Sequence, residues 1–400
     1  MFEQLEGSVA VAKAVARCRP EVVCAYPITP QTHIVEGLSR MVWDGSLAPC
    51  EFINVESEFA ALSVAIGASA TGARAYTATA SQGLLYMAEA LYNAAGLGLP
   101  IVMTVANRAI GAPINIWNDH SDSMSQRDCG WLQLFAEDNQ QAVDLHVQAF
   151  RIAEELSLPV MVCMDGFVLT HAFEQVELPT ADQVDEFLPA FQPRQVLDPQ
   201  APVSIGAMVG PEAFTEVRYL AHVGHQRALS VIPEIGSRYG SIVGRPGVSL
   251  VSPYFSAGAD TVVIALGSVL GTLKDTVDGL RADGHRVGVL GITSYRPFPA
   301  AAVRAATDGA RRVVVVERSL APGGGETVTT DVRSALAGSG VEISTVIAGL
   351  GGRPIIRTSL RAMITAAEGD ALEPLTFLDL DRDAIAAVLT STSAPTGGTR

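Results

Sequence analysis

Polar and charged residues follow successive apolar segments in the first 110 residues of the chain. The polar residues are a hydroxyl at Thr29, a carboxylate at Glu58, the small turn Ser81-Gln82 and a guanidinium at Arg108. If the apolar segments are parallel strands, their carboxyl ends meet at one edge of a sheet, where open α/β folds bind ligands. These groups can hydrogen-bond a polar ligand, hold a proton and bind an anion. The sequence therefore predicts a ligand site on this edge.

Two of these residues also have purely structural interpretations as helix starts. Thr29 can cap the helix that follows, with Pro30 at its first position, a favoured pairing. Ser57 can likewise cap a helix in which Glu58 is a first-turn carboxylate attracted by the helix dipole.

The other polar residues have structural alternatives as well. The Ser81-Gln82-Gly83 stretch can be only a turn, and Arg108 can form a salt bridge with Asp119 or Asp122. The DHSD run at 119–122 contains possible metal ligands, but a solvated or hydrogen-bonded loop is the favoured interpretation. The glycine-rich APGGGETV run at 321–328 matches neither phosphate-binding motif and indicates a tight turn between a strand and a helix.

An alternation of strands and helices is expected to position the site residues. Apolar runs predict parallel strands covered by helices on both faces, and the 3.6-residue spacing of apolar residues predicts the helices. The predicted strands are 21–26, 50–55, 73–79, 100–106 and 159–165, and the predicted helices are 30–42, 57–70, 83–96 and 139–157.

A second, smaller α/β block is expected near the C-terminus. It has predicted strands at 261–268, 286–292 and 311–318 with helices between them, whereas 173–250 are expected to form an irregular connection. We therefore predict a first domain at 1–245, a second at 246–370 and a C-terminal segment at 371–400, of which the last ten residues are expected to be disordered.

The composition narrows the class of protein. The net charge of −15 argues against nucleic-acid binding, which requires a basic face. Charged residues make up only 17% of the chain, which indicates surface that is buried against partners. The five cysteines have no CxxC spacing, so neither a disulfide framework nor an iron–sulfur or zinc site is expected in this chain. With neither a signal-like start nor a membrane-length apolar run, a cytoplasmic protein is expected.

Several long motifs, taken together, resemble the alpha subunit of 2-oxoacid:ferredoxin oxidoreductases, most closely the pyruvate branch. They are YPITPQT, ESEFAALSVAIGASATGARAYTATASQGLLYM, NRAIGAPINIWNDHSDSMSQRDCGW and LPVMVCMDGFVLTH. The resemblance implies a pyrimidine-side domain for thiamine diphosphate and a domain like the C-terminal domain of transketolases. It also implies a beta subunit that supplies the diphosphate side and Mg²⁺. Gamma and delta subunits, [4Fe-4S] clusters on partner chains, ferredoxin and coenzyme A complete the implied system. The chain agrees by omission, because the MDGF stretch at 164–167 lacks the leading glycine of a diphosphate motif.

The resemblance also implies roles for individual residues. Glu58 matches the glutamate that hydrogen-bonds the aminopyrimidine ring, with Pro27, Ile28, Ser81 and Gln82 beside the cofactor. Arg108 matches the arginine that binds the 2-oxoacid carboxylate, and Thr29 matches the threonine that hydrogen-bonds the same substrate. No metal ligand is implied on this chain. The Ser81–Leu84 stretch resembles pyruvate enzymes, while branched-chain 2-oxoacids, 2-oxoglutarate and aryl-glyoxylates are the alternatives.

Two further hypotheses come from other classes of protein. The chain can be a non-catalytic scaffold subunit, against which the combination of Thr29, Glu58 and Arg108 argues. It can also be a self-sufficient thiamine enzyme, against which the missing diphosphate motif argues.

Overall fold

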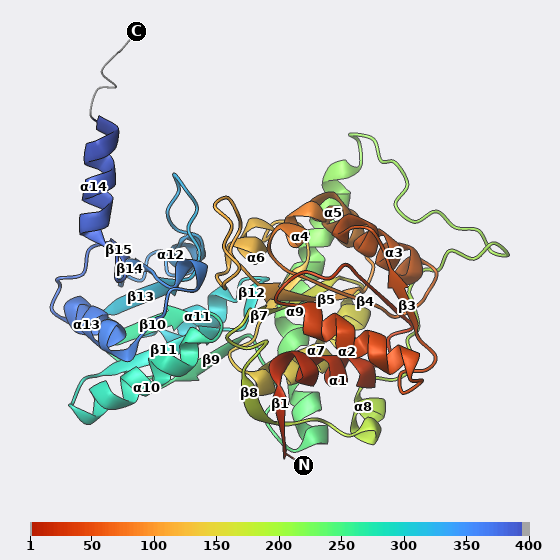
Figure 1. The fold of residues 1–400 in the computed structure, drawn as a ribbon, viewed down its shortest axis with the longest axis horizontal. Coiled ribbons are helices and arrows are strands. Elements are labelled where there is room, and N and C mark those ends of the chain that lie inside the picture. The colour runs from red at the N-terminus through yellow and green to blue at the C-terminus, as the bar shows by residue number, and fades with distance from the viewer. Residues whose placement is uncertain (1, 394–400) are drawn as a thin grey trace, which may run out of the picture.

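The computed structural model describes residues 2–393 and contains two α/β domains side by side (Figure 1). The first domain is built on a seven-stranded sheet in the order β12-β6-β7-β5-β4-β2-β3, parallel except for β12. Its strands are β2 (Val22–Ala25), β3 (Glu51–Asn54), β4 (Ala75–Thr79), β5 (Val102–Asn107), β6 (Leu132–Phe135), β7 (Val160–Asp165) and β12 (Ser294–Arg296).

Helices cover both faces of this sheet because its central strands are apolar on both sides. One face packs on α1 (Gly7–Arg17), α2 (Thr32–Trp43), α7 (Asn139–Leu156), α8 (Ala181–Phe187) and α9 (Phe214–Val243). The other face packs on α3 (Glu58–Ala70), α4 (Ser81–Tyr86) and α5 (Ala88–Gly96). The short α6 (Ser121–Ser125) follows β5, and β1 (Phe2–Glu6) and β8 (Phe173–Glu177) form a separate two-stranded antiparallel sheet.

The second domain has a six-stranded sheet in the order β15-β14-β13-β10-β11-β9, parallel except for β9. The strands are β9 (Val251–Tyr254), β10 (Thr261–Ala265), β11 (Val287–Ile292), β13 (Arg312–Glu317), β14 (Glu342–Ile347) and β15 (Leu375–Phe377). The helices are α10 (Val269–Ala282), α11 (Ala300–Ala306), α12 (Val328–Ala335), the 3₁₀ turn η1 (Leu350–Gly352), α13 (Arg357–Glu368) and α14 (Arg382–Ser393).

The two domains share hydrophobic packing and a strand. One core cluster includes Leu62 and Leu91 of the first domain together with Val262 and Val313 of the second. Strand β12 lies beyond the second domain's first strands in the sequence, yet it pairs antiparallel with β6. The predicted boundary at 245/246 lies between α9 and β9, and β12, from beyond this boundary, belongs to the sheet of the first domain.

The predicted α/β class is confirmed, and each predicted strand coincides with an observed one. The expectation of an irregular connection over 173–250 was wrong, because it contains α9, which runs for 30 residues. Pro233 lies inside α9 and obscured it, but Ala228, Ile232 and Ile235 bury one face of the helix. The single helix predicted at 83–96 is broken into α4 and α5 at Met87.

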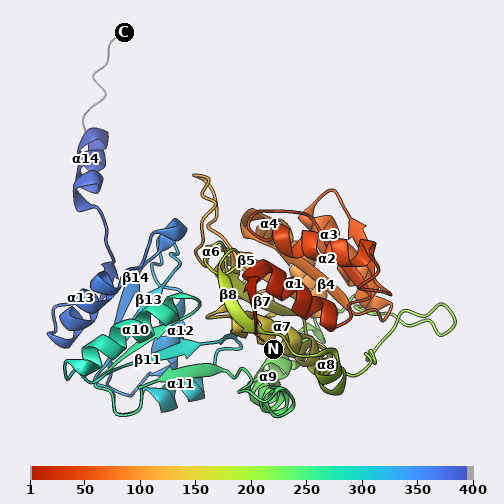
Figure 2. The same ribbon diagram turned by 60° about the horizontal axis from the view of Figure 1, so that its bottom comes forward.

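Two segments extend from the body of the molecule. The chain between α8 and α9 projects from the first domain, and α14 projects from the second (Figures 1 and 2). Residues 394–400, most of the segment predicted to be disordered, lie outside the described residues, while 391–393 end α14. In the described part of the chain, the helices are too short or too polar to cross a membrane.

Candidate active site

Arg108 and Thr29 meet at the carboxyl edge of the first sheet. Arg108 directly follows β5, and Thr29 lies in the turn between β2 and α2. The Arg108 guanidinium donates from Nη1 to the Thr29 carbonyl at 2.9 Å and from Nε to the Asn115 carbonyl at 3.3 Å. Partial burial lowers the pKa of Arg108, but a guanidinium remains charged at neutral pH. Within residues 2–393 no carboxylate pairs with this guanidinium, so the salt bridge to Asp119 or Asp122 was a wrong alternative.

Thr29 does not cap the helix that follows it. Helix α2 begins at Thr32, and the Gln31 amide is fully buried and donates to the Tyr26 and Ala78 carbonyls at 3.0 Å each. The capping interpretation of Thr29 was therefore wrong, and a buried glutamine fixes the turn instead. Pro27 is exposed and Ile28 is half-buried in the same turn.

Glu58 is buried at the start of α3, where Ser57 caps the helix by accepting a hydrogen bond from the Ala60 N–H at 3.2 Å. The Glu58 side chain is only 8% exposed, yet among residues 2–393 it has no hydrogen-bond or ion-pair partner. A Cβ added to Gly83 would lie 2.8 Å from Glu58 Oε1 and 2.6 Å from Thr79 Oγ1. The Thr79 hydroxyl is also buried without a partner. The missing side chain at Gly83 thus leaves room for the Glu58 carboxylate and the Thr79 hydroxyl.

Ser81 is buried, and its hydrogen bonds stay within the chain. Its hydroxyl donates to the Ala109 carbonyl at 2.6 Å and is also bonded to Gln82 Oε1. Its N–H donates to Asp122 Oδ2 at 2.9 Å. Ser81 has a φ of 51°, in the left-handed region where non-glycine residues carry strain. The structure therefore favours a positioning role for Ser81, and its predicted contact with a cofactor, like that of half-buried Gln82, stays a prediction.

Asp122 accepts four hydrogen bonds at this edge of the sheet, although the sequence pattern did not indicate it as a site residue. Its Oδ2 accepts hydrogen bonds from the Ser81 and Arg108 N–H groups at 2.9 and 3.0 Å. Its Oδ1 accepts from Asn107 Nδ2 at 2.8 Å and from the Ser123 N–H at 2.7 Å. Burial raises the pKa of Asp122 to about 6, against the lowering effect of these bonds. One carboxylate thus ties the end of β5 to the start of α4.

Asp165 ends β7 and joins the two domains. It is 1% exposed and accepts hydrogen bonds from Arg318 Nη1 at 2.5 Å and from the Ser268 N–H at 2.8 Å, and its Oδ1 lies 2.7 Å from His120 Nε2. Burial alone would raise its pKa, but the charges of Arg318 and His120 outweigh burial and hold the pKa of Asp165 well below its usual range. Asp165 is the acidic residue of the MDGF stretch, and its oxygens are fully used by this network.

The hydrogen-bonded interpretation of the DHSD run is confirmed. Asp119 accepts from the Gly351 N–H at 3.0 Å, while His120 and Asp122 serve the two networks above. The APGGGETV run forms a turn after β13, with a bridge between Ala321 and Gly325.

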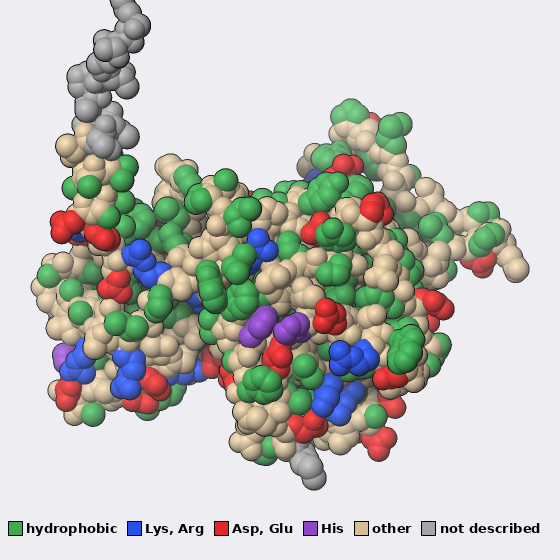
Figure 3. All heavy atoms as spheres, in the orientation of Figure 1, with side chains coloured by type: hydrophobic (Ala, Val, Ile, Leu, Met, Phe, Trp, Pro, Cys, Tyr) green, Lys and Arg blue, Asp and Glu red, His purple; other side chains and the backbone are tan. Residues whose placement is uncertain are grey.

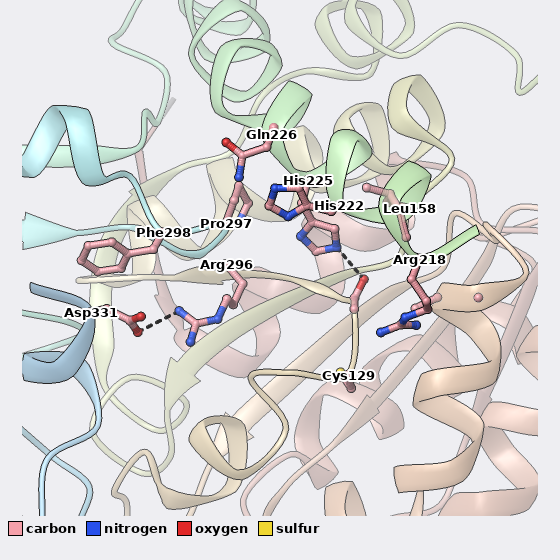
Figure 4. Close-up of a pocket in the computed structure, with 14 residues that line it drawn as sticks. Cys129, Leu158, Arg218, His222, His225, Gln226, Arg296, Pro297, Phe298 and Asp331 are labelled. Carbon is pink, nitrogen blue, oxygen red and sulfur yellow. Dashed lines mark hydrogen bonds and ion pairs between the residues drawn. The ribbon is translucent and has the colours of Figure 1, made fainter. Parts of the chain in front are cut away.

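A separate cavity of about 340 Å³ lies away from this edge, between α9, β12 and α12 (Figure 4). His225 donates to the Gly130 carbonyl at 3.0 Å, and Arg296 pairs with Asp331 at 3.0 Å. Its other polar side chains include Arg218 and His222. None of the predicted site residues lines this cavity, so it is distinct from the carboxyl edge.

The fold of this chain is also found in a solved 2-oxoacid oxidoreductase. A solved structure of 2-oxoglutarate:ferredoxin oxidoreductase from Magnetococcus marinus, bound to 2-oxoglutarate, coenzyme A and succinyl-CoA, superposes with a TM-score of 0.67 and 19% identity. The match covers 91% of this chain and 64% of that chain, so this chain spans less than two thirds of that relative's length.

Family models assign the chain more narrowly. Residues 13–236 match the pyruvate flavodoxin/ferredoxin oxidoreductase, thiamine diphosphate-binding family, and residues 259–359 match pyruvate:ferredoxin oxidoreductase core domain II. The chain belongs to this oxidoreductase family, as its motifs indicated.

Curated relatives agree over nearly their full length. Pyruvate synthase subunit PorA of Methanosarcina barkeri is 47% identical over 95% of this chain and 96% of its own, and that of Methanocaldococcus jannaschii is 43% identical over 91% and 94%. Ketoisovalerate oxidoreductase subunit VorA of Pyrococcus horikoshii is 38% identical over 90% and 92%.

The residues at the carboxyl edge could pair with polar groups of a thiamine cofactor, the cofactor of the matched family. Glu58 is a buried carboxylate without a partner, and Thr79 Oγ1 is an orphaned buried hydroxyl beside it. Gly83 keeps the space next to both open. A buried hydroxyl costs free energy when left unpaired, and an unpaired carboxylate beside it can accept a hydrogen bond, which is consistent with a ligand that pairs with both.

Proposed function

We propose that this chain is the alpha subunit of a thiamine diphosphate-dependent 2-oxoacid:ferredoxin oxidoreductase that acts on pyruvate with coenzyme A and ferredoxin. Its family membership and the PorA relatives support this function. The observation that carries the proposal is that one edge of the sheet holds both a largely buried Glu58, whose carboxylate has no partner among the described residues, and a half-buried Arg108. The Arg108 guanidinium is hydrogen-bonded to the Thr29 turn.

Each residue of the edge has a proposed role. When bound, thiamine diphosphate supplies the nucleophile for the keto carbon and accepts the electron pair that decarboxylation leaves. Glu58 hydrogen-bonds the aminopyrimidine ring nitrogen and holds a proton there. Arg108 keeps its side chain fixed through two carbonyls and offers its remaining N–H groups to the substrate carboxylate. Thr29 contributes its hydroxyl to the same substrate.

The surroundings of the edge support a partner subunit that completes the site. Large apolar side chains beside the predicted site residues are exposed, among them Tyr86 at 61%, Ile114 at 80% and Trp117 at 51%. Exposed apolar groups concentrated around a binding site are typical of a protein interface. We assign this surface to a beta subunit that holds the diphosphate and Mg²⁺, with [4Fe-4S] clusters on further partner chains.

A branched-chain 2-oxoacid is the second candidate substrate. The observation that favours it is the 38% identity to a ketoisovalerate oxidoreductase subunit over 90% of this chain. The residues that bind the carboxylate would be the same, so the choice depends on the pocket around the substrate side chain.

Reconstitution with the partner subunits tests the proposed function. We expect the assembled enzyme to reduce a low-potential dye in the presence of thiamine diphosphate and coenzyme A, with pyruvate preferred over 2-oxoisovalerate and 2-oxoglutarate. Activity of this chain alone would contradict the need for a beta subunit. Absence of activity from the assembled, cofactor-loaded complex with every 2-oxoacid would favour the scaffold hypothesis.

A further inference from the structure

Three side chains from distant parts of the sequence meet on the surface of the first domain. Glu6 precedes α1, His33 lies in the first turn of α2 and His171 follows β7. One ligand atom from each lies within 4.8 Å of the others. His33 Nδ1 lies 2.6 Å from Glu6 Oε1, and the rings of His33 and His171 are 4.9 Å apart. Figure 3 shows histidine and acidic side chains gathered on the face that it draws.

We propose that Glu6, His33 and His171 form a binding site for a divalent transition-metal ion of the Zn²⁺ class. Two imidazoles and one carboxylate are the protein ligands of many zinc sites that keep a coordination position open. Imidazole nitrogens favour zinc and its neighbours in the periodic table over Mg²⁺ and Ca²⁺, which prefer oxygen ligands only. This site is independent of the proposed 2-oxoacid chemistry.

The backbone around the site is held rigidly before any ion binds. The Gly7 N–H donates to the Ala172 carbonyl at 3.0 Å, and the Ser8 N–H donates to the Thr170 carbonyl at 2.9 Å. A Cβ on Gly7 would lie 2.1 Å from the Leu169 carbonyl oxygen, so only glycine allows this close approach. Glu6 and His171 are therefore fixed relative to each other by two backbone bonds, which lowers the entropic cost of bringing ligands together.

The two histidines have different hydrogen-bond partners: His33 Nδ1 contacts Glu6 within the site, and His171 Nδ1 contacts Thr170 outside it. The His171 Nδ1 lies 2.7 Å from the Thr170 hydroxyl, an outer partner that can fix the tautomer in which Nε2 is open to a metal. The His33 side chain is 46% exposed and the Glu6 side chain 16% exposed, so an ion can enter from solvent. Replacing the short Glu6–His33 hydrogen bond by metal ligation needs only small side-chain rotations.

Two aromatic side chains, Phe167 and Trp117, connect this site to the segment next to Arg108. The His171 ring is 4.8 Å from Phe167, and Phe167 is 4.7 Å from Trp117. The Trp117 carbonyl accepts the Ala109 N–H at 3.0 Å, next to Arg108. An ion on His171 would therefore lie close to the segment that carries Arg108.

Titration of the full chain with metal ions tests the site. The apo chain is titrated with Zn²⁺ against a chelating dye, and Co²⁺ binding is followed by its visible absorption. We expect one Zn²⁺ per chain at this site. Because loss of an outer partner alone weakens metal sites by about 10- to 100-fold, Thr170→Val should weaken binding by that factor, and His33→Ala or His171→Ala by about 100-fold or more.

The chain offers two matched controls. His285 forms a similar 2.6 Å contact with Glu368 but has no second imidazole in the group, and His222 lies near His225 in the separate cavity. His285→Ala and His222→Gln should leave the Zn²⁺ affinity and the Co²⁺ spectrum unchanged. Equal affinity in the wild-type chain, His33→Ala and His171→Ala would overturn the proposal, as would loss of binding in either control alone.

Discussion

Two neighbouring strands of the first sheet end in opposite ways. At the end of β7, Asp165 is buried and its oxygens accept bonds from Arg318, Ser268 and His120. At the end of β5, the Arg108 guanidinium has only carbonyls as partners within the described residues. Beside the end of β4, Glu58 at the start of α3 is largely buried and has no partner within the described residues.

This difference distinguishes groups that stabilise the fold from groups that could bind a ligand at the carboxyl edge of the first sheet. Carboxylate oxygens whose bonding capacity is filled hold the domains together, whereas polar groups that keep unused bonding capacity at this edge can pair with a ligand. The Asp165 oxygens belong to the first kind, and the Glu58 carboxylate and the Arg108 guanidinium belong to the second.

Removing Asp165 should have the largest effect on stability. Asp165→Ala leaves the buried Arg318 without its counter-charge, which costs about 3–5 kcal/mol for a broken buried pair. Chemical unfolding of the full chain measures the change. The control is Asp185→Ala, which removes the partner of the exposed Arg19 and should shift stability by at most about 1 kcal/mol. Equal effects would mean that the β7 end does not lock the domains.

Arg108→Ala should weaken use of the 2-oxoacid without unfolding the chain. The KM for pyruvate in the assembled enzyme is expected to rise by about 10- to 100-fold, because a charged hydrogen-bonding pair is lost. Thiamine diphosphate affinity should change little. The matched control is Arg304→Ala, since Arg304 also bonds a carbonyl, that of Ala335, far from the edge. An unchanged KM would remove Arg108 from the substrate site.

The two buried aspartates should respond to pH in opposite directions. The pKa of Asp122 is raised to about 6, above an unfolded value near 3.9, so its protonation stabilises the fold below about pH 4 and this stabilisation is lost as pH rises through about 6. The contribution is on the order of 1–3 kcal/mol. The pKa of Asp165 is depressed, so its contribution is present above about pH 4 and is lost only in strong acid.

Asp122→Asn separates these contributions. The amide NH₂ would face backbone N–H donors, so the variant should be less stable by about 1–3 kcal/mol. Its stability should also lose the component that changes between about pH 4 and 6. Unfolding midpoints measured across this range check both points, and an unchanged pH profile would contradict the assignment to Asp122.

Much of the fold could be predicted because its strands are apolar on both faces. Runs such as 159–165 have few other interpretations, and the helices between them carry clear 3.6-residue periodicity. Strand β12 could not be predicted, because three residues with no apolar pattern depend on a partner strand 160 positions earlier, at β6. Helix α9 was missed because Pro233 and several glycines hide a long apolar face.

The site was predictable only in part for a related reason. Thr29, Glu58, Ser81 and Arg108 follow strand ends, and the topology brings those ends together. The hydrogen-bond partners of each residue depend on tertiary contacts. The spacing of residues in the sequence therefore could not show that Asp122 bonds β5 to α4, or that Asp165 bonds one domain to the other. The one available signal was an aspartate that ends a buried apolar strand, since such a charge requires partners.

The most direct test of the division along this edge is Glu58→Gln. In the assembled enzyme loaded with thiamine diphosphate, exchange of the thiazolium C2 proton should slow by about 10²- to 10⁴-fold, because the residue that holds the proton is lost. The free energy of unfolding should stay within about 0.5 kcal/mol, since Glu58 has no partner to lose. Normal proton exchange in this variant, or a loss of stability as large as that of Asp165→Ala, would contradict the account.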